Sequence, residues 1–84
     1  MYPVMFSIKK SVPPRNVKKI LGEIAEISGV VKVGQLDPSS AVADIQRMGY
    51  AYVASPEEAR AVVDSLKALT AIATASEPAV RAAV

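Results

Sequence analysis

The sequence predicts an α+β fold in which two helices cover one face of a four-stranded antiparallel sheet. Three observations support this prediction. Four segments have the alternating or β-branched apolar residues that are typical of strands, at 2–9, 30–36, 49–54 and 70–75. Two segments between them have apolar residues at helical spacing. The chain has 84 residues, 51% of them hydrophobic, so we expect one small core.

The first strand has a period of two. Val4, Phe6 and Ile8 share the face that we expect to be buried, and Met5 lies on the opposite face. The two prolines that follow, at 13 and 14, stop the strand and suit the first turn of a helix.

The first helix is indicated by a single apolar stripe, made up of Val17, Ile20, Leu21, Ile24 and Ile27. Lys18 and Lys19 fall on the side that faces water. Gly29 ends the helix, because glycine accepts the left-handed conformation that closes helices.

Two further strands precede the second helix. Residues 30–36 are rich in β-branched residues, and a turn at 37–40 stops them. Residues 49–54 alternate between large and small side chains, as a strand does. The stretch 41–48 between them suits a helical turn and a long hairpin arm about equally, so both interpretations stay open.

Residues 55–58 (SPEE) are the clearest local signal in the chain. Ser55 is expected to cap a helix by accepting a hydrogen bond from the Glu58 amide, with Pro56 in the first helical position. The Glu58 carboxylate is expected to accept from the Ser55 amide in return, and Glu57 suits the positive end of the helix dipole. The apolar stripe of this helix consists of Ala59, Val62, Val63, Leu66 and Leu69.

The predicted order is strand, helix, strand, strand, helix, strand. Because strand–helix–strand crossovers are right-handed, both helices fall on one face of the sheet, which is the ferredoxin-like arrangement. We expect residues 1–75 to form this domain and residues 76–84 to form a tail of small residues. The other face of the sheet stays uncovered, which makes it the first candidate for a binding surface.

The composition argues against catalysis. The chain has no cysteine and no histidine, which excludes disulfides, thiol chemistry and an imidazole base. Helix capping explains Glu57 and Glu58, and no glycine-rich phosphate loop is present. Asp37, Asp44 and Asp64 are too scattered for a metal site. We therefore expect a chain that is not an enzyme and that holds no cofactor and no metal.

The net charge is +2, and the cations are unevenly placed. The cations that precede the first acid, Glu23, are Lys9, Lys10, Arg15, Lys18 and Lys19. They either attract an anionic partner or are solvated ends of a strand and a helix. No apolar run approaches the roughly 20 residues that span a bilayer, so we expect no membrane contact. The lack of cysteine and of a signal-peptide pattern favours a cytoplasmic location.

Tyr50 and Tyr52 are informative because they share one face of the third strand, while Ala51 and Val53 share the other. If Ala51 and Val53 pack on the helices, the tyrosines stand side by side on the open face, where Met5 joins them. Such paired aromatics serve as a base-stacking platform, or as an apolar patch for dimerisation or for a peptide. The opposite orientation would place both rings in the core, and the sequence leaves this choice open.

Residues 49–53 (GYAYV), followed by 55–59 (SPEEA), are similar to the third strand and second helix of the RNA-recognition-motif family. This resemblance implies that Tyr50 and Tyr52 stack bases. The chain departs from that family in two places. The family's first strand presents an outward aromatic, whereas Phe6 shares the inward register, and Ser55 stands where a final aromatic is expected.

A second resemblance covers more of the chain. Residues 2–6 (YPVMF), 49–51 (GYA), 55–58 (SPEE) and 76–78 (SEP), in their order around a helix and a short strand, are similar to subtilisin propeptides and to free-standing inhibitors built on the same domain. In that family the segment after the last strand lies extended in the protease cleft. The resemblance implies a protease-contacting tail that begins with Glu77, Pro78, Ala79, Val80 and Arg81. Small side chains fit such an extended pose. The alternative is that these residues are a frayed terminus.

The sequence therefore predicts a small binding module that contacts its partner through the open sheet face and the tail. The favoured function is a propeptide-like protease inhibitor, because that resemblance accounts for the inward Phe6 and the tail together. The alternative is an RNA-binding or homodimerising module that uses Tyr50 and Tyr52, with the early cations touching phosphate. A net charge of +2 predicts little non-specific attraction to nucleic acid at physiological salt. A small-molecule regulatory domain of the same topology has no supporting motif.

Overall fold

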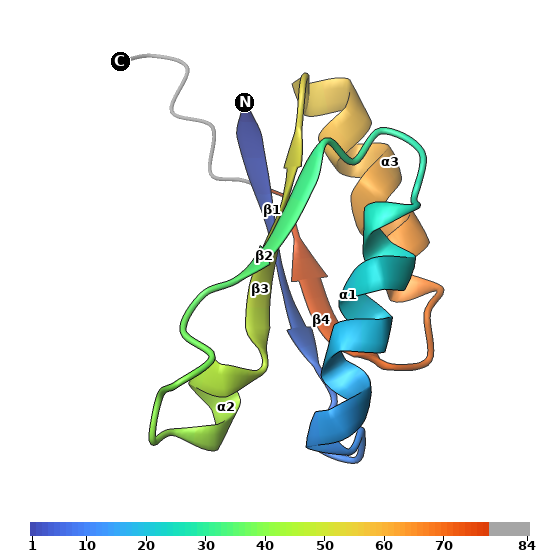
Figure 1. The fold of residues 1–84 in the computed structure, drawn as a ribbon. Coiled ribbons are helices and arrows are strands. Elements are labelled where there is room, and N and C mark those ends of the chain that lie inside the picture. Colours follow the sequence, from blue (N-terminus) through green and yellow to red (C-terminus); the bar gives the residue numbers. More distant parts are fainter. Residues whose placement is uncertain (78–84) are drawn as a thin grey trace.

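Residues 1–77 are described by a computed structural model, in which four antiparallel strands form one open sheet with α1 and α3 on the same face (Figure 1). The elements are β1 (Tyr2–Ile8), the 3-10 turn η1 (Pro14–Asn16), α1 (Val17–Ala25), β2 (Lys32–Gln35), α2 (Ala43–Gln46), β3 (Met48–Val53), α3 (Pro56–Lys67) and β4 (Ile72–Ser76). The strands lie in the order β2-β3-β1-β4. This is the ferredoxin-like α+β fold that the sequence predicts.

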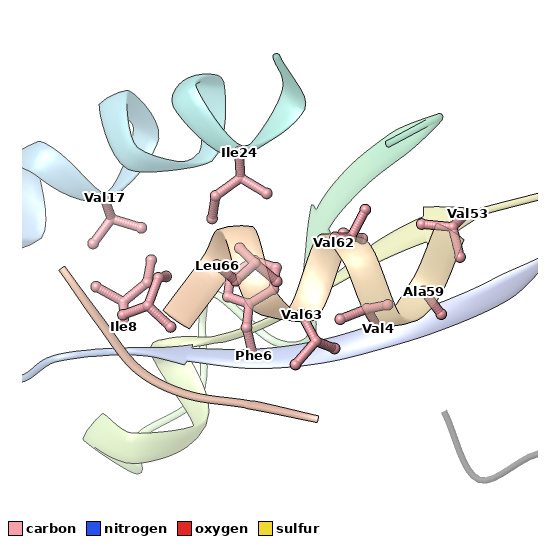
Figure 2. Close-up of a cluster of buried hydrophobic side chains, with 12 residues drawn as sticks. Val4, Phe6, Ile8, Val17, Ile24, Val53, Ala59, Val62, Val63 and Leu66 are labelled. Carbon is pink, nitrogen blue, oxygen red and sulfur yellow. The ribbon is translucent and has the colours of Figure 1, made fainter. Parts of the chain in front are cut away.

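The core lies between the sheet and the two long helices. Figure 2 shows buried side chains of β1 and α3 pointing toward one another. The core consists of Val4, Phe6, Ile8, Val17, Ile24, Ala51, Val53, Ala59, Val62, Val63, Leu66 and Ile72. No polar or charged side chain within residues 1–77 is buried. Burial of apolar surface, about 1.5–3 kcal/mol for each large side chain, therefore stabilises this interior.

Of the two hydrogen bonds predicted for the N-terminal cap of α3, one is present and the other has a different donor. The Ser55 hydroxyl accepts a hydrogen bond from the Glu58 amide at 3.2 Å, as predicted. The Glu58 carboxylate accepts from the Ala54 amide at 3.3 Å, so the predicted acceptance from Ser55 is wrong by one residue. Because β3 ends at Val53, the Ala54 amide lies beyond the strand ladder and is available to the carboxylate.

Several elements differ from the sequence prediction in their bounds, among them β2, which is limited to Lys32–Gln35 where 30–36 was predicted. The first helix ends at Ala25, and Gly29, at a φ of +96°, closes the turns that follow it. The open stretch 41–48 contains the single helical turn α2. The last strand begins at Ile72 and includes Ser76, which the sequence assigned to the tail. Its start is late because the Ile72 amide still donates to the Leu69 carbonyl, in the turn that leaves α3.

The pairing of β1 with β3 decides which side chains enter the core. Phe6 lies opposite Gly49, and Val4 lies opposite Ala51. A Cβ atom on Gly49 would lie 2.5 Å from Phe6 Cζ and 2.8 Å from the Gly34 carbonyl oxygen. The Phe6 ring thus occupies the space that any other residue at position 49 would need.

We predict that Gly49→Ala lowers the free energy of unfolding by about 1–3 kcal/mol, because the Phe6 ring or the backbone must shift. The matched control is Gly22→Ala, since Gly22 is exposed on α1 and a Cβ there meets nothing within 4 Å. That control should raise the free energy of unfolding by about 0.5–1 kcal/mol through helix propensity. Urea unfolding of both variants provides the measurement, and effects of the same sign would contradict the packing argument.

Candidate binding face

The uncovered face of the sheet carries the side chains that alternate with the core residues. Tyr50 and Tyr52 belong to this face, and Ala51 and Val53 between them are fully buried. The structure therefore places both tyrosines away from the core. We define the apolar patch as four half-buried side chains on this face, Met5, Met48, Tyr50 and Tyr52. Met5 lies directly opposite Tyr50, so β1 and β3 contribute to one continuous surface.

The Tyr50 ring lies across the neighbouring strand β2. Tyr50 pairs with Gly34, and a Cβ atom on Gly34 would meet the Tyr50 hydroxyl and lie 2.5 Å from its Cζ. A glycine at this position thus lets the ring rest directly on the backbone of β2.

The two tyrosine rings pack against each other edge to face. Their centroids are 5.1 Å apart, and their planes meet at 63°. This arrangement is favourable for an aromatic pair, and it makes the two rings one interlocked surface rather than two parallel plates.

Polar groups border the apolar patch on both sides. Lys32 lies opposite Tyr52 and is exposed. On the other side, the hydroxyls of Ser7 and Thr74 are 2.6 Å apart and join β1 to β4 by a side-chain hydrogen bond. An apolar centre with a polar rim is the usual composition of a protein contact surface.

The early cations predicted from the sequence do not gather in one place. Lys9 and Lys10 follow the end of β1, and the Lys10 ammonium lies 3.0 Å from the Asp44 carboxylate. Lys18 and Lys19 are exposed on α1, which covers the other face of the sheet (Figure 1). Arg15 lies in η1, ahead of α1. Of these five cations, Lys9 and Lys10 are the two that line a cleft together with Ser7 and Met48.

Of the predicted protease-contacting segment that begins at Glu77, only Glu77 belongs to the described part of the chain. The Glu77 carboxylate accepts a hydrogen bond from Arg60 Nε on α3 at 3.3 Å, in an ion pair that is largely exposed. Pro78, Ala79, Val80 and Arg81 lie outside the described residues. The strand that leads into this tail, β4, is an edge strand.

Comparison with known proteins finds no family model, curated protein or solved structure that matches this chain. Within residues 1–77, no three acidic side chains stand close enough to hold a metal ion. No helix in the same range has the length and apolar character needed to span a bilayer. A function for the chain must therefore be argued from the geometry of its surfaces.

Two residues of this face were missed by the sequence reasoning. Met48 was left in an unassigned connection, although it continues the alternation of Tyr50 and Tyr52 by one step toward the N-terminus. Gly34 was placed in the predicted strand 30–36 without a role of its own. Its role depends on the aromatic that pairs with it, so the register of β2 against β3 was the missing information.

We predict that Gly34→Ala displaces the Tyr50 ring, because the new methyl group would occupy the position of the phenol. In the Tyr50→Ala background the same change should be neutral or stabilising, since alanine forms strands better than glycine. A double-mutant cycle on the free energy of unfolding should give a coupling of roughly 1 kcal/mol. Additive effects of the two changes would show that the ring does not rest on Gly34.

Proposed function

We propose that this chain is a non-enzymatic module that binds another protein through the apolar patch. The observation that supports it most directly is the composition of that patch: Met5, Met48, Tyr50 and Tyr52 form a continuous apolar surface, and α1 and α3 pack on the other side of the sheet (Figure 1). Tyrosine and methionine are enriched in protein interfaces, and tyrosine buries a large area at low entropic cost. Association would remove this surface from water.

The ring geometry favours a protein partner over RNA. Bases stack on aromatic rings that offer an open, accessible face. Tyr50 already rests one face on Gly34, and Tyr52 is turned by 63° toward it, so the pair offers one uneven apolar surface. An uneven surface of this kind suits interdigitating side chains better than a row of parallel bases.

The particular form that we propose is a protease inhibitor similar to subtilisin propeptides. Two features support it. Within residues 1–77 the last buried residue is Ile72, at the start of β4, so the described core ends before Glu77. The Arg60–Glu77 ion pair lies at the start of the tail, beside α3. A segment that follows the described core in this way suits the role of the chain that enters a protease cleft.

We predict that removing residues 78–84 abolishes inhibition of a subtilisin-type protease and leaves the midpoint of thermal unfolding nearly unchanged. The truncation starts after Glu77 because Ser76 pairs with Met5 in the sheet. A matched control replaces residues 78–84 by a glycine-serine segment of equal length, which separates the sequence of the tail from its length. An intact chain that does not inhibit the protease would refute the inhibitor form of the proposal.

We predict that Tyr50→Ala and Tyr52→Ala each weaken binding of the protein partner by about 2 kcal/mol or more, as central aromatic residues of interfaces do. Asp64→Ala, on the exposed side of α3, is the control and should leave binding unchanged. The measurement is calorimetry with the protease inactivated at its nucleophile.

The same two variants decide between this proposal and its rivals. If the chain binds RNA, replacing either tyrosine by alanine should weaken binding by about 1–3 kcal/mol per stacked base. The measurement is a salt-titrated binding assay with a single-stranded oligonucleotide. For homodimerisation, light scattering across a dilution series should report a dimer for the intact chain and a monomer for the double variant. Either result, without any binding to a protease, would replace the proposed partner.

A further inference from the structure

A cleft of about 590 Å³ opens where β1 ends, between α2 and the start of β4. Its volume falls in the range of small-molecule sites, roughly 300–1,000 Å³. The cations that line it are Lys9, Lys10 and Arg47, and Asp44 is the acid among its lining residues. Ser7 and Thr74 contribute hydroxyls, and Ile8 and Met48 contribute apolar surface. The lining therefore carries two more positive charges than negative ones.

Arg47 is held in a fixed position at this cleft. Its guanidinium donates a hydrogen bond from Nη1 to the Lys9 carbonyl at 2.9 Å, and its own carbonyl accepts from the Ile8 amide at 2.9 Å. The Lys9 amide in turn donates to the Ala71 carbonyl at 2.8 Å. These three hydrogen bonds hold the turn after β1 to Arg47 on one side and to Ala71, just before β4, on the other. A guanidinium has five N–H donors, so one bond to a carbonyl leaves others for an anion.

The carboxylate in the cleft is weakly engaged. Lys10 and Asp44 lie 3.0 Å apart, but their side chains are 72% and 67% exposed. Exposed ion pairs of this kind contribute little to stability. An anion of higher charge that enters the cleft would therefore attract Lys10 away from Asp44 at small cost.

We propose that this cleft binds a phosphate monoester carried on a small molecule. A phosphate monoester has a charge of about −1.5 to −2 at neutral pH, which balances the excess positive charge of the lining. A planar guanidinium is suited to bidentate contact with phosphate oxygens, and the two ammonium groups supply further charge-assisted hydrogen bonds. The apolar side chains of Ile8 and Met48 offer contact to the body of the ligand.

The bounded volume and the presence of Asp44 favour a small ligand over a nucleic acid, whose backbone needs a longer cationic track. The site is also separate from the tail. The cleft contains Ala73 near the beginning of β4, whereas the tail follows the other end of that strand, after Ser76. Met48 lines this cleft and also belongs to the apolar patch, so the two surfaces adjoin. Because the phosphate titration uses the chain without a protease, its outcome does not depend on the proposed protease contact.

The test is an NMR titration of the isotope-labelled full chain with adenosine 5′-monophosphate and with inorganic phosphate. Adenosine is the uncharged counterpart of the first ligand. We expect saturable shifts confined to residues 7–11, 43–48 and 72–74 with both phosphates, and none with adenosine. Arg47→Gln and Lys9→Gln should each weaken binding by about tenfold, the loss expected for a charge-assisted hydrogen bond.

Two further variants keep the result decisive if Arg47→Gln destabilises the fold. Asp44→Asn removes the competing carboxylate and should tighten phosphate binding by about threefold. Lys19→Gln removes one charge from α1 on the other face of the sheet and should leave binding unchanged. An absence of saturable binding, or an equal loss in Lys19→Gln and Lys9→Gln, would overturn the proposal. Tighter binding of a single-stranded oligonucleotide than of the monophosphate would replace the small ligand by nucleic acid.

Discussion

The contact between the Phe6 ring and Gly49 fixes the register of the two central strands, and the rest of the structure depends on that register. The two residues are direct partners, and the ring fills the space of a Cβ atom. Because directly opposed residues of paired strands share one face of the sheet, a slip of one residue would put Phe6 and Tyr50 on the same face, both buried or both exposed. One pairing therefore determines both the composition of the core and the composition of the apolar patch.

On the open face, Tyr50 and Gly34 pack in the same way as Phe6 and Gly49. In both pairs an aromatic ring lies over a glycine of the adjacent strand, once toward the helices and once toward the open face. Glycine normally weakens a strand, since it offers no side chain to pack. Here the ring of the partner strand supplies that packing, so the cost is offset on both faces of the sheet. As a result, the Tyr50 ring lies close to the backbone of β2 on the open face.

Local signals allowed most of the fold to be predicted from the sequence, and long-range pairing explains what they missed. Strand alternation and the Ser55 cap act over a few residues, so β1, β3 and α3 were predicted close to their bounds. A four-residue helix such as α2 has too few positions to show a period. The orientation of the tyrosines could be stated only as a condition on Ala51 and Val53. The cleft could not be predicted, because Lys9 and Arg47 are 38 residues apart and meet only through strand pairing.

The wholly apolar interior of residues 1–77 has a thermal consequence. No buried polar network adds enthalpy to this interior, so its stability rests on the hydration of apolar groups. That contribution is largely entropic near room temperature and weakens on cooling. We therefore expect the free energy of unfolding to pass through a maximum and to fall on cooling as well as on heating.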